Sequence, residues 1–152
     1  MRRVFVNEEW CLGCHLCEYH CANANMGGVT AQDMVRNLRG KKIHPRIRVE
    51  DGADGGKINF AVQCRHCYDP MCVKSCIAGA LTVEDGVVTH NPDKCVGCFT
   101  CVLTCPYGCV MPDGDGKVVQ KCELCLRNKV GAPACAEHCP NRAIVYEERG
   151  TL

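Results

Sequence analysis

The sequence predicts an α+β fold of short hairpins and short helices, with a core formed largely by groups bound to cysteine. Seventeen of the 152 residues are cysteine, a share typical of scaffolds that cysteines hold together. Hydrophobic residues make up 47% of the chain when cysteine is counted. Subtracting the cysteines, about 11% of the chain, leaves roughly 36%, which is below the usual apolar share. Short strand patterns recur between the cysteines, so an ordinary apolar core would be thin.

Sixteen cysteines form four groups of four. In each group two residues separate the first two cysteines, and three residues separate the last two. The groups are Cys11, Cys14, Cys17 and Cys21; Cys64, Cys67, Cys72 and Cys76; Cys95, Cys98, Cys101 and Cys105; and Cys122, Cys125, Cys135 and Cys139. The middle spacing is two residues in the first and third groups, four in the second and nine in the fourth. Cys109 is left over.

Strand and helix signals flank these groups in a regular order. The expected strands are Arg3–Asn7, 47–49, 57–62, 77–83, 87–90 and 142–146. Two hairpins follow from them, one around the turn Asp51–Gly56 and one with Gly86 in its turn. A short helix is expected over 31–38, and each fourth cysteine is expected to start a helical turn. Cysteine groups and strands therefore recur together as an internal repeat.

The surroundings of the cysteines favour metal ligation over disulfides. No apolar segment follows Arg2 and Arg3, as an export signal would require, and no run of about 18 apolar residues occurs. We therefore expect a cytoplasmic chain without direct membrane insertion, in a compartment where disulfides do not persist. The odd number of cysteines also argues against complete pairing.

The third group identifies the kind of centre. Its run, C-x2-C-x2-C-x3-C followed by Pro106, is that of bacterial ferredoxins, in which the fourth cysteine ligates the other cluster of a pair. Zinc sites use two C-x2-C halves, and the fourth group taken alone could pass for one. The further cysteines at the x2 and x3 spacings fit iron–sulfur clusters better. We therefore expect four 4Fe–4S clusters, with the groups exchanging their fourth cysteines.

The four groups together resemble the four-cluster electron-transfer subunits of the DMSO reductase and formate dehydrogenase type. The stretch from Cys64 to Cys72, CRHCYDPMC, is similar to the second motif of that family. The resemblance is strongest to the short soluble forms that accompany carbon-monoxide dehydrogenases, hydrogenases, and formate or aldehyde oxidoreductases. It implies two interleaved ferredoxin-like units. One is 1–60 plus 110–152, with a basic insertion at 22–60, and the other is 61–109.

The resemblance also implies which cysteines share a cluster, since it pairs the second group with the third and the first with the fourth. The implied sets are cluster A, with Cys11, Cys14, Cys17 and Cys139; cluster B, with Cys122, Cys125, Cys135 and Cys21; cluster C, with Cys64, Cys67, Cys72 and Cys105; and cluster D, with Cys95, Cys98, Cys101 and Cys76. Cys109 is expected to be a small buried apolar side chain and not a ligand. The family often has proline after the fourth cysteine, but here Ala22 follows Cys21 and Ile77 follows Cys76.

These features predict a non-catalytic relay of single electrons between a catalytic redox subunit and an acceptor or donor. All cluster positions are filled by cysteine, and no nucleotide fingerprint or nucleophile motif occurs. The implied partner is a molybdenum or tungsten oxidoreductase, a carbon-monoxide dehydrogenase or a hydrogenase of anaerobic metabolism. A ferredoxin or flavoprotein partner and self-assembly through exposed clusters stay open. So do two alternative functions, a free polyferredoxin carrier and a redox sensor or enzyme-maturation accessory protein.

Several other residues are given roles by their positions. The insertion carries six cations, read either as a solvated loop or as a docking surface for an acidic partner: Arg36, Arg39, Lys41, Lys42, Arg46 and Arg48. Without aromatic stacking residues beside them, they do not indicate nucleic acid. Four histidines beside ligands are expected to form hydrogen bonds to cluster sulfur or to pack as shields over the clusters, and not to be ligands: His15, His20, His66 and His138. Water-excluding shields are expected from Trp10, Tyr68, Phe99 and Tyr107. Lysines beside ligands are read either as surface residues or as modifiers of potential: Lys74, Lys94 and Lys121.

Overall fold

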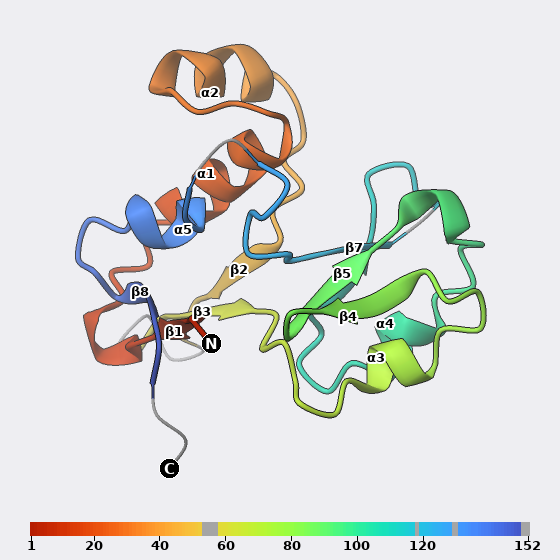
Figure 1. Cartoon of the computed structure of the whole chain (residues 1–152). Helices are drawn as coiled ribbons and strands as arrows, with labels where there is room; N and C mark the ends of the chain where they lie inside the picture. Colours follow the sequence, from red (N-terminus) through yellow and green to blue (C-terminus); the bar gives the residue numbers. More distant parts are fainter. Residues whose placement is uncertain (53–57, 118, 129–130, 150–152) are drawn as a thin grey trace. The chain divides into compact units, whose positions relative to one another are not determined.

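The computed structural model describes residues 1–52, 58–117, 119–128 and 131–149, and divides the chain into two compact units (Figure 1). Unit 1 is Met1–Val62 with Leu124–Leu152, and unit 2 is Gln63–Glu123. In the described part of the chain, the helices and the strands are all short, and the strands pair in twos. The predicted α+β class with short helices and hairpins is therefore confirmed.

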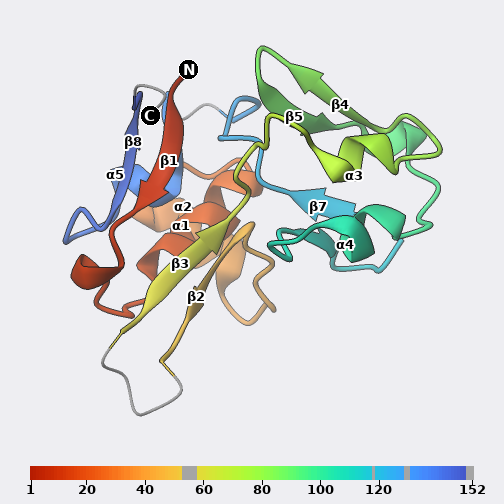
Figure 2. The ribbon, with the colours of Figure 1, turned by 90° about the horizontal axis from the view of Figure 1, so that it is seen from below.

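Unit 1 joins the two ends of the chain. Strand β1 (Arg3–Val6) pairs antiparallel with β8 (Ile144–Glu147), with Val6 opposite Ile144 (Figure 2). Strands β2 (Ile47–Glu50) and β3 (Phe60–Gln63) form a second pair. The helices of this unit are η1 (Glu8–Trp10), α1 (Leu16–Asn25), α2 (Ala31–Leu38) and α5 (Ala134–Glu137). Helix α1 packs against α2, α5 and β2, and is thus the centre of the unit.

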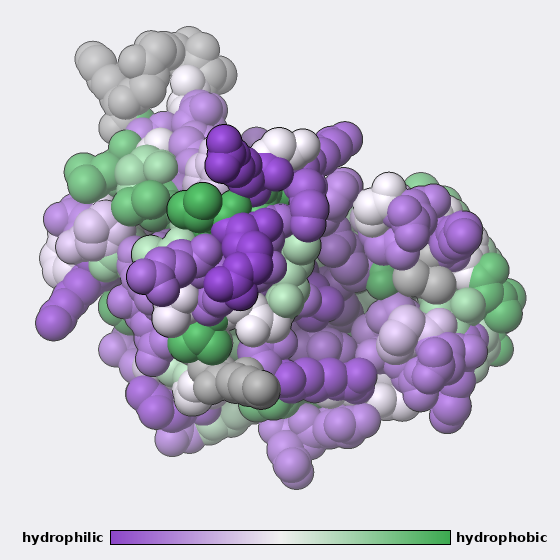
Figure 3. Space-filling model, turned by 90° about the horizontal axis from the view of Figure 1, so that it is seen from above, coloured by the Kyte–Doolittle hydropathy of each residue, from purple (hydrophilic) through white to green (hydrophobic). Residues whose placement is uncertain are grey.

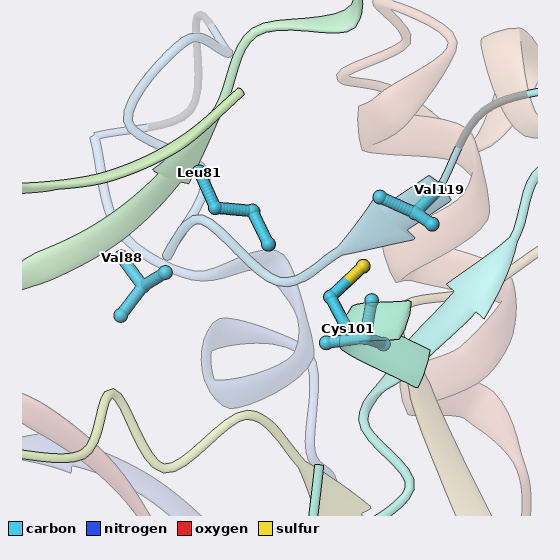
Figure 4. Close-up of a cluster of buried hydrophobic side chains, with 5 residues drawn as sticks. Leu81, Val88, Cys101 and Val119 are labelled. Carbon is cyan, nitrogen blue, oxygen red and sulfur yellow. The ribbon is translucent and has the colours of Figure 1, made fainter. Parts of the chain in front are cut away.

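The described part of unit 2 contains two consecutive hairpins, two short α-helices and one single-turn helix. The elements are α3 (Met71–Lys74), β4 (Leu81–Glu84), β5 (Val87–His90), η2 (Pro92–Lys94), α4 (Thr100–Thr104), β6 (Val110–Pro112) and β7 (Val119–Lys121). Its apolar cluster consists of Leu81, Val88, Cys101, Val110 and Val119, four of which surround a common interior in Figure 4. Half-buried cysteines, including Cys72, Cys76, Cys95 and Cys105, pack against this cluster. The apolar core is thus small and is bordered by cysteine.

The boundary between the units differs from the one expected from the sequence. The expected division assigned 110–152 to the first unit, whereas unit 2 continues to Glu123. The hairpin β6–β7 accounts for the difference, since its Val110 and Val119 are buried in the apolar cluster of unit 2. Burial of these two side chains ties the hairpin to the third cysteine group, which precedes it.

The helix over 31–38 and the other predicted strands are present with shifts of at most two residues at their ends, but β3 begins at Phe60 and β4 at Leu81. The start of the predicted strand 77–83 is instead a turn, in which Gly79 N–H donates to Cys76 O, and residue 57 lies outside the described residues. Helix α2 begins at a capping box, in which Asp33 N–H donates to Thr30 Oγ1 and Thr30 N–H donates to the Asp33 carboxylate. Such a reciprocal cap satisfies free N–H groups at the start of a helix. The predicted turn after Asp51 lies largely outside the described residues.

We expected a helical turn to start at each fourth cysteine, and this prediction is wrong. Each cluster helix instead begins one residue before the third cysteine, so that Cys17, Cys72, Cys101 and Cys135 are second residues of their helices. Third and fourth cysteines are four positions apart, about one helical turn, so the helix lies between them. Three helices end before the fourth cysteine, whereas α1 continues past Cys21 to Asn25. Ala22 lets α1 continue where a proline would stop it.

The two units repeat one construction. Asn7 N–H donates to Ala143 O at 2.7 Å in unit 1, and Asn91 N–H donates to Ala80 O at 2.8 Å in unit 2. Each asparagine precedes a single-turn helix that leads into Cys11 or Cys95. Both alanines stand four residues after a fourth cysteine, Cys139 or Cys76. The start of one group is therefore fixed to the end of another in the same way in each unit.

Hydrophilic side chains cover most of the face seen in Figure 3, with separated hydrophobic side chains between them. Several large apolar side chains are nevertheless well exposed, among them Leu103 and Ile77. None of the described helices has the length and apolar character needed to cross a membrane.

Candidate metal centres

The four cysteine groups begin with the same backbone turn. The residue before the second cysteine has a positive φ in every group: +63° at Gly13, +47° at His66, +67° at Gly97 and +53° at Leu124. Glycine adopts this conformation without strain, whereas other residues need support from their surroundings. His66 and Leu124 have that support, since they are 1% and 3% exposed. Left-handed residues of this kind create concave backbone turns whose N–H groups can face an anion.

The third cysteine of each group is delivered by a short helix in one of two ways. In the closely spaced groups, His15 and Phe99 adopt left-handed backbone conformations immediately before α1 and α4. In the wider groups, Pro70 and Pro133 precede α3 and α5. Proline suits this place because the first N–H groups of a helix have no partner within it. The number of residues between the second and third cysteines varies among the groups. The third cysteine is nevertheless the second residue of a short helix in each of them.

Four cysteines of unit 1 line one cavity: Cys11, Cys14, Cys17 and Cys139. Three come from the first group and one from the fourth. Trp10, Leu12 and Ile144 also line the cavity, so its walls are largely apolar. Trp10 is 54% exposed and thus covers the cavity from the solvent side. These are the residues that the family resemblance assigns to cluster A.

A cavity in unit 2 is lined by Cys95, Cys98 and Cys101 of the third group and by Cys76 of the second. Phe99 lies in its wall. This is the set of cysteines that the resemblance assigns to cluster D.

A second cavity of unit 2 is lined by Cys64, Cys67 and Cys72 of the second group and by Cys105 of the third. Cys109 is a fifth cysteine in its wall. The second and third groups thus each contribute three cysteines to one cavity and one to the other. Among the described residues, no three His, Cys, Asp or Glu side chains are placed to hold a single metal ion.

For cluster B, the structure shows some of the assigned cysteines close to one another. Cys21 and Cys125, both in unit 1, are close enough for the charge of one to affect the other. Cys135 is buried in α5, which packs against α1. Cys122 is the penultimate residue of unit 2. The structure therefore brings Cys21 beside a member of the fourth group.

Donors to sulfur recur at the fourth cysteines. Ala80 N–H donates to Cys76 Sγ at 3.2 Å, and Cys109 N–H donates to Cys105 Sγ at 3.3 Å, each from four residues along the chain. At Cys21 the helix continues, and other donors serve the sulfur. These are Arg46 N–H at 3.2 Å and the side-chain amide of Asn25 at 3.4 Å. Hydrogen bonds to ligand sulfurs tune cluster potentials. Sequence reasoning missed Asn25 and the backbone role of Arg46, which no local pattern indicates.

The surroundings of the thiols suit cationic partners. Burial raises the pKa of Cys17 to about 12, and the pKa values of Cys21 and Cys101 to about 11. Burial also raises the pKa of Cys72, whereas hydrogen bonds from Thr100 lower that of exposed Cys98. A buried thiolate needs a positive partner to offset its desolvation. Iron supplies that charge, so the four-thiol cavities fit iron–sulfur clusters.

The histidines beside the groups have packing and hydrogen-bonding contacts. His15 Nδ1 lies 2.9 Å from Glu18 Oε2, and the rings of His20 and His138 stack at 3.8 Å. Val88 N–H donates to Nδ1 of buried His66 at 3.1 Å. These contacts are to a carboxylate, a second imidazole ring and a backbone amide, so the expected hydrogen bonds to cluster sulfur and the shielding of clusters stay predictions.

The expected aromatic shields differ from one another. Trp10, Phe99 and Tyr107 line the three cavities described above. Tyr68 is 85% exposed, so the expectation of a shield at this position is wrong. It stands in the wider spacing of the second group, where Tyr68 and Asp69 are exposed before the chain reaches buried Pro70.

The three lysines beside ligands also separate into two kinds. Lys74 is well exposed and pairs with Asp69, and Lys94 is exposed. Lys121, by contrast, is 1% exposed. The sequence alone does not distinguish them, because each simply precedes a cysteine or stands near one.

The chain is similar to known iron–sulfur proteins. Residues 57–149 match the family described as a 4Fe-4S dicluster domain. The whole chain is 32% identical to the electron transport protein HydN of Escherichia coli, over 99% of this chain and 90% of HydN. It is 29% identical to the probable anaerobic dimethyl sulfoxide reductase chain YnfG of the same organism, over 97% of this chain and 77% of YnfG. It is 37% identical to the E. coli protein AegA over 94% of this chain, but spans only 21% of AegA.

Proposed function

Because the chain belongs to the 4Fe–4S dicluster domain family and is an iron–sulfur electron-transfer protein, we propose that it relays single electrons through four clusters to or from a catalytic redox subunit. The sixteen cysteines of the four groups would hold the clusters in sets A to D, as assigned above. The observation that carries this proposal is the lining of three cavities, each by three cysteines of one group and one of another. That is the ligand exchange of a two-cluster ferredoxin.

The same architecture supports two interleaved ferredoxin-like units. In unit 2 the exchanging groups follow one another along the chain, and β4 and β5 form a hairpin between them. In unit 1 the equivalent strands are β8 and β1, from opposite ends of the chain. The matched Asn7–Ala143 and Asn91–Ala80 hydrogen bonds support the same relationship. On this proposal, the second unit is inserted within the first.

The side chains of this protein hold the clusters and do not react with a substrate. A 4Fe–4S cluster with four thiolate ligands accepts or donates one electron. Each set offers four thiols and each cysteine of the groups is used once, so no ligand position is left for a substrate. Trp10, Phe99 and Tyr107 would limit water at the clusters, and donors such as Arg46 N–H would adjust their potentials. We therefore assign the chemistry to a partner subunit.

The partner on this proposal is a catalytic subunit of the molybdenum or tungsten oxidoreductase type. The similarity to the dimethyl sulfoxide reductase chain YnfG supports this class. The basic segment, defined as 36–48, supports docking, because its Arg36, Lys41 and Lys42 are exposed. The backbone of Arg46 in the same segment contacts Cys21 Sγ. An acidic partner surface bound there would lie close to a ligand of cluster B. We also place the chain in a reducing cytoplasm, since the spacings of the four groups suit thiolate ligands better than disulfides.

A reductive titration tests the relay itself. Anaerobically purified protein should take up about four electrons per chain, one for each cluster. An uptake of about two would contradict the four-cluster assignment and leave half of the sixteen cysteines without a role.

Co-purification from the native host tests the partner. The chain should elute with a larger redox enzyme, and Lys41→Glu with Lys42→Glu should weaken that association at low salt without loss of iron. Exposed charges act most strongly at low ionic strength. Elution of the wild-type chain alone, with its full iron content, would favour a free polyferredoxin carrier.

A further inference from the structure

Lys121 is the most unusual charged residue of unit 2. It is the last residue of β7, directly before Cys122, and it is 1% exposed. Lysine is almost never fully buried without a partner, because its ammonium group loses its hydration. Something in the folded protein must therefore compensate this charge.

The surrounding hydrogen bonds compensate it only in part. Lys121 Nζ donates to Val88 O at 2.6 Å and to Cys122 O. Both acceptors are neutral carbonyl groups. Within the described residues, Nζ forms no ion pair with a carboxylate. The ammonium group is held in place by neutral acceptors, and its counter-charge has to come from elsewhere.

The cavity assigned to cluster C is a source of negative charge beside Lys121. Val88, whose carbonyl holds Nζ, lines that cavity together with Cys64, Cys67 and Cys72. Since Lys121 is 1% exposed, its charge acts on this cavity with little screening by water.

We propose that Lys121 is a fixed internal counter-charge of cluster C, and that it makes this cluster easier to reduce than it would otherwise be. The inference rests on the proposed function, since it requires a cluster in this cavity. A cluster gains one negative charge on reduction, so a nearby buried cation stabilises the reduced form. The ammonium group would in turn gain the counter-charge that its burial requires.

The internal repeat provides a natural comparison. Gln63 occupies the corresponding place before the second group: it ends β3, directly precedes Cys64 and is also 1% exposed. The fold therefore tolerates a buried neutral amide at the end of a strand that leads into a cysteine group with a long middle spacing. Lys121→Gln removes the charge while it keeps a long polar side chain of the kind already used in this fold.

The experiment is an anaerobic redox titration of the loaded, full-length protein, followed by EPR spectroscopy. In Lys121→Gln the midpoint potential of one cluster should fall, while the others stay unchanged. The affected signal should be the one that Cys105→Ser also changes, and Lys121→Arg should restore it. Lys74→Gln and Lys94→Gln are matched controls, since these exposed lysines also stand near ligands but are screened by water. The shift in Lys121→Gln should persist at high salt, because the charge is buried.

Four unshifted midpoint potentials in fully loaded Lys121→Gln would overturn the inference. If Lys121→Gln loses about four irons per chain, the charge-retaining Lys121→Arg decides the matter. Full loading of that variant supports a counter-charge, and equal loss in both variants indicates a merely structural role and overturns the inference. A wild-type chain without its clusters would instead refute the proposed function, so the two failures can be told apart.

Discussion

The backbone N–H of Cys109 donates a hydrogen bond to Cys105 Sγ at 3.3 Å. Ala80 donates to Cys76 Sγ in the same way at 3.2 Å. Cys109 thus occupies the position that a small apolar residue fills in the neighbouring group, and it is buried, with 4% of its surface exposed. Its own thiol donates to Tyr107 O. The backbone of Cys109 serves the ligand, and its side chain fills space.

Cys109→Ala should therefore retain the full iron content and all four midpoint potentials. The loss of a small buried side chain and a weak thiol hydrogen bond should cost about 1 kcal/mol of folding stability. Iron analysis and thermal unfolding under anaerobic conditions measure both effects. Loss of one whole cluster would mean that Cys109 is a ligand and that another cysteine of this cavity is not.

The exchange of fourth cysteines predicts which substitutions act together. Cys105→Ser and Cys64→Ser should alter the same EPR signal, although the two residues belong to different groups. Cys76→Ser and Cys95→Ser should alter another. Spectra of the reduced variants test this. If Cys105→Ser and Cys95→Ser changed one common signal, the third group would hold a cluster by itself.

Gly97→Ala should prevent proper assembly of the loop that carries Cys95 and Cys98. Gly97 has a φ of +67°, and a Cβ at this position would stand 2.3 Å from Lys117 O. Gly79 is a matched control in the same unit, with a φ of +59° and no described atom within 4 Å of such a Cβ. Gly79→Ala should cost about 1 kcal/mol.

Gly97→Ala should lower the free energy of unfolding several-fold more than Gly79→Ala does, because the backbone near Lys117 must also move. The measurements are iron content and anaerobic thermal unfolding. Equal losses of stability in the two alanine variants would show that close contact with Lys117 is not a constraint on this loop.

Removal of iron should unfold the chain. Each of the three described cavities occupies the space beside a small apolar cluster or a short helix, and several of the cysteines that line them are buried or pack against the core. Ligation free energy is then folding free energy. Circular dichroism of chelator-treated protein should show loss of the native spectrum and of a cooperative thermal transition. A native spectrum after complete iron removal would refute this role of the clusters.

The sequence predicts the repeated parts of the fold well, because their signals are local. Turn residues mark the β4–β5 hairpin, and the Thr30–Asp33 cap marks the start of α2. The β6–β7 hairpin was not predicted. Its first strand is only three residues long and ends in Pro112, a residue that weakens any strand signal. Only the burial of Val110 and Val119 in unit 2 explains why this hairpin forms.

The cysteine groups themselves could be identified from spacing, but their supporting residues could not. Lys121 resembles Lys94 in sequence, since both directly precede the first cysteine of a group, yet one is buried and the other exposed. Asn25 serves Cys21 only because α1 continues for a further turn. Burial and the length of a helix depend on packing between distant segments, which spacing along the chain does not encode.

The iron and acid-labile sulfide content of anaerobically purified wild-type protein tests the central claim most directly. Four clusters held by sixteen cysteines predict about 16 iron and about 16 sulfide per chain. Stoichiometric zinc without sulfide would contradict the account, as would an iron content of about half the predicted value.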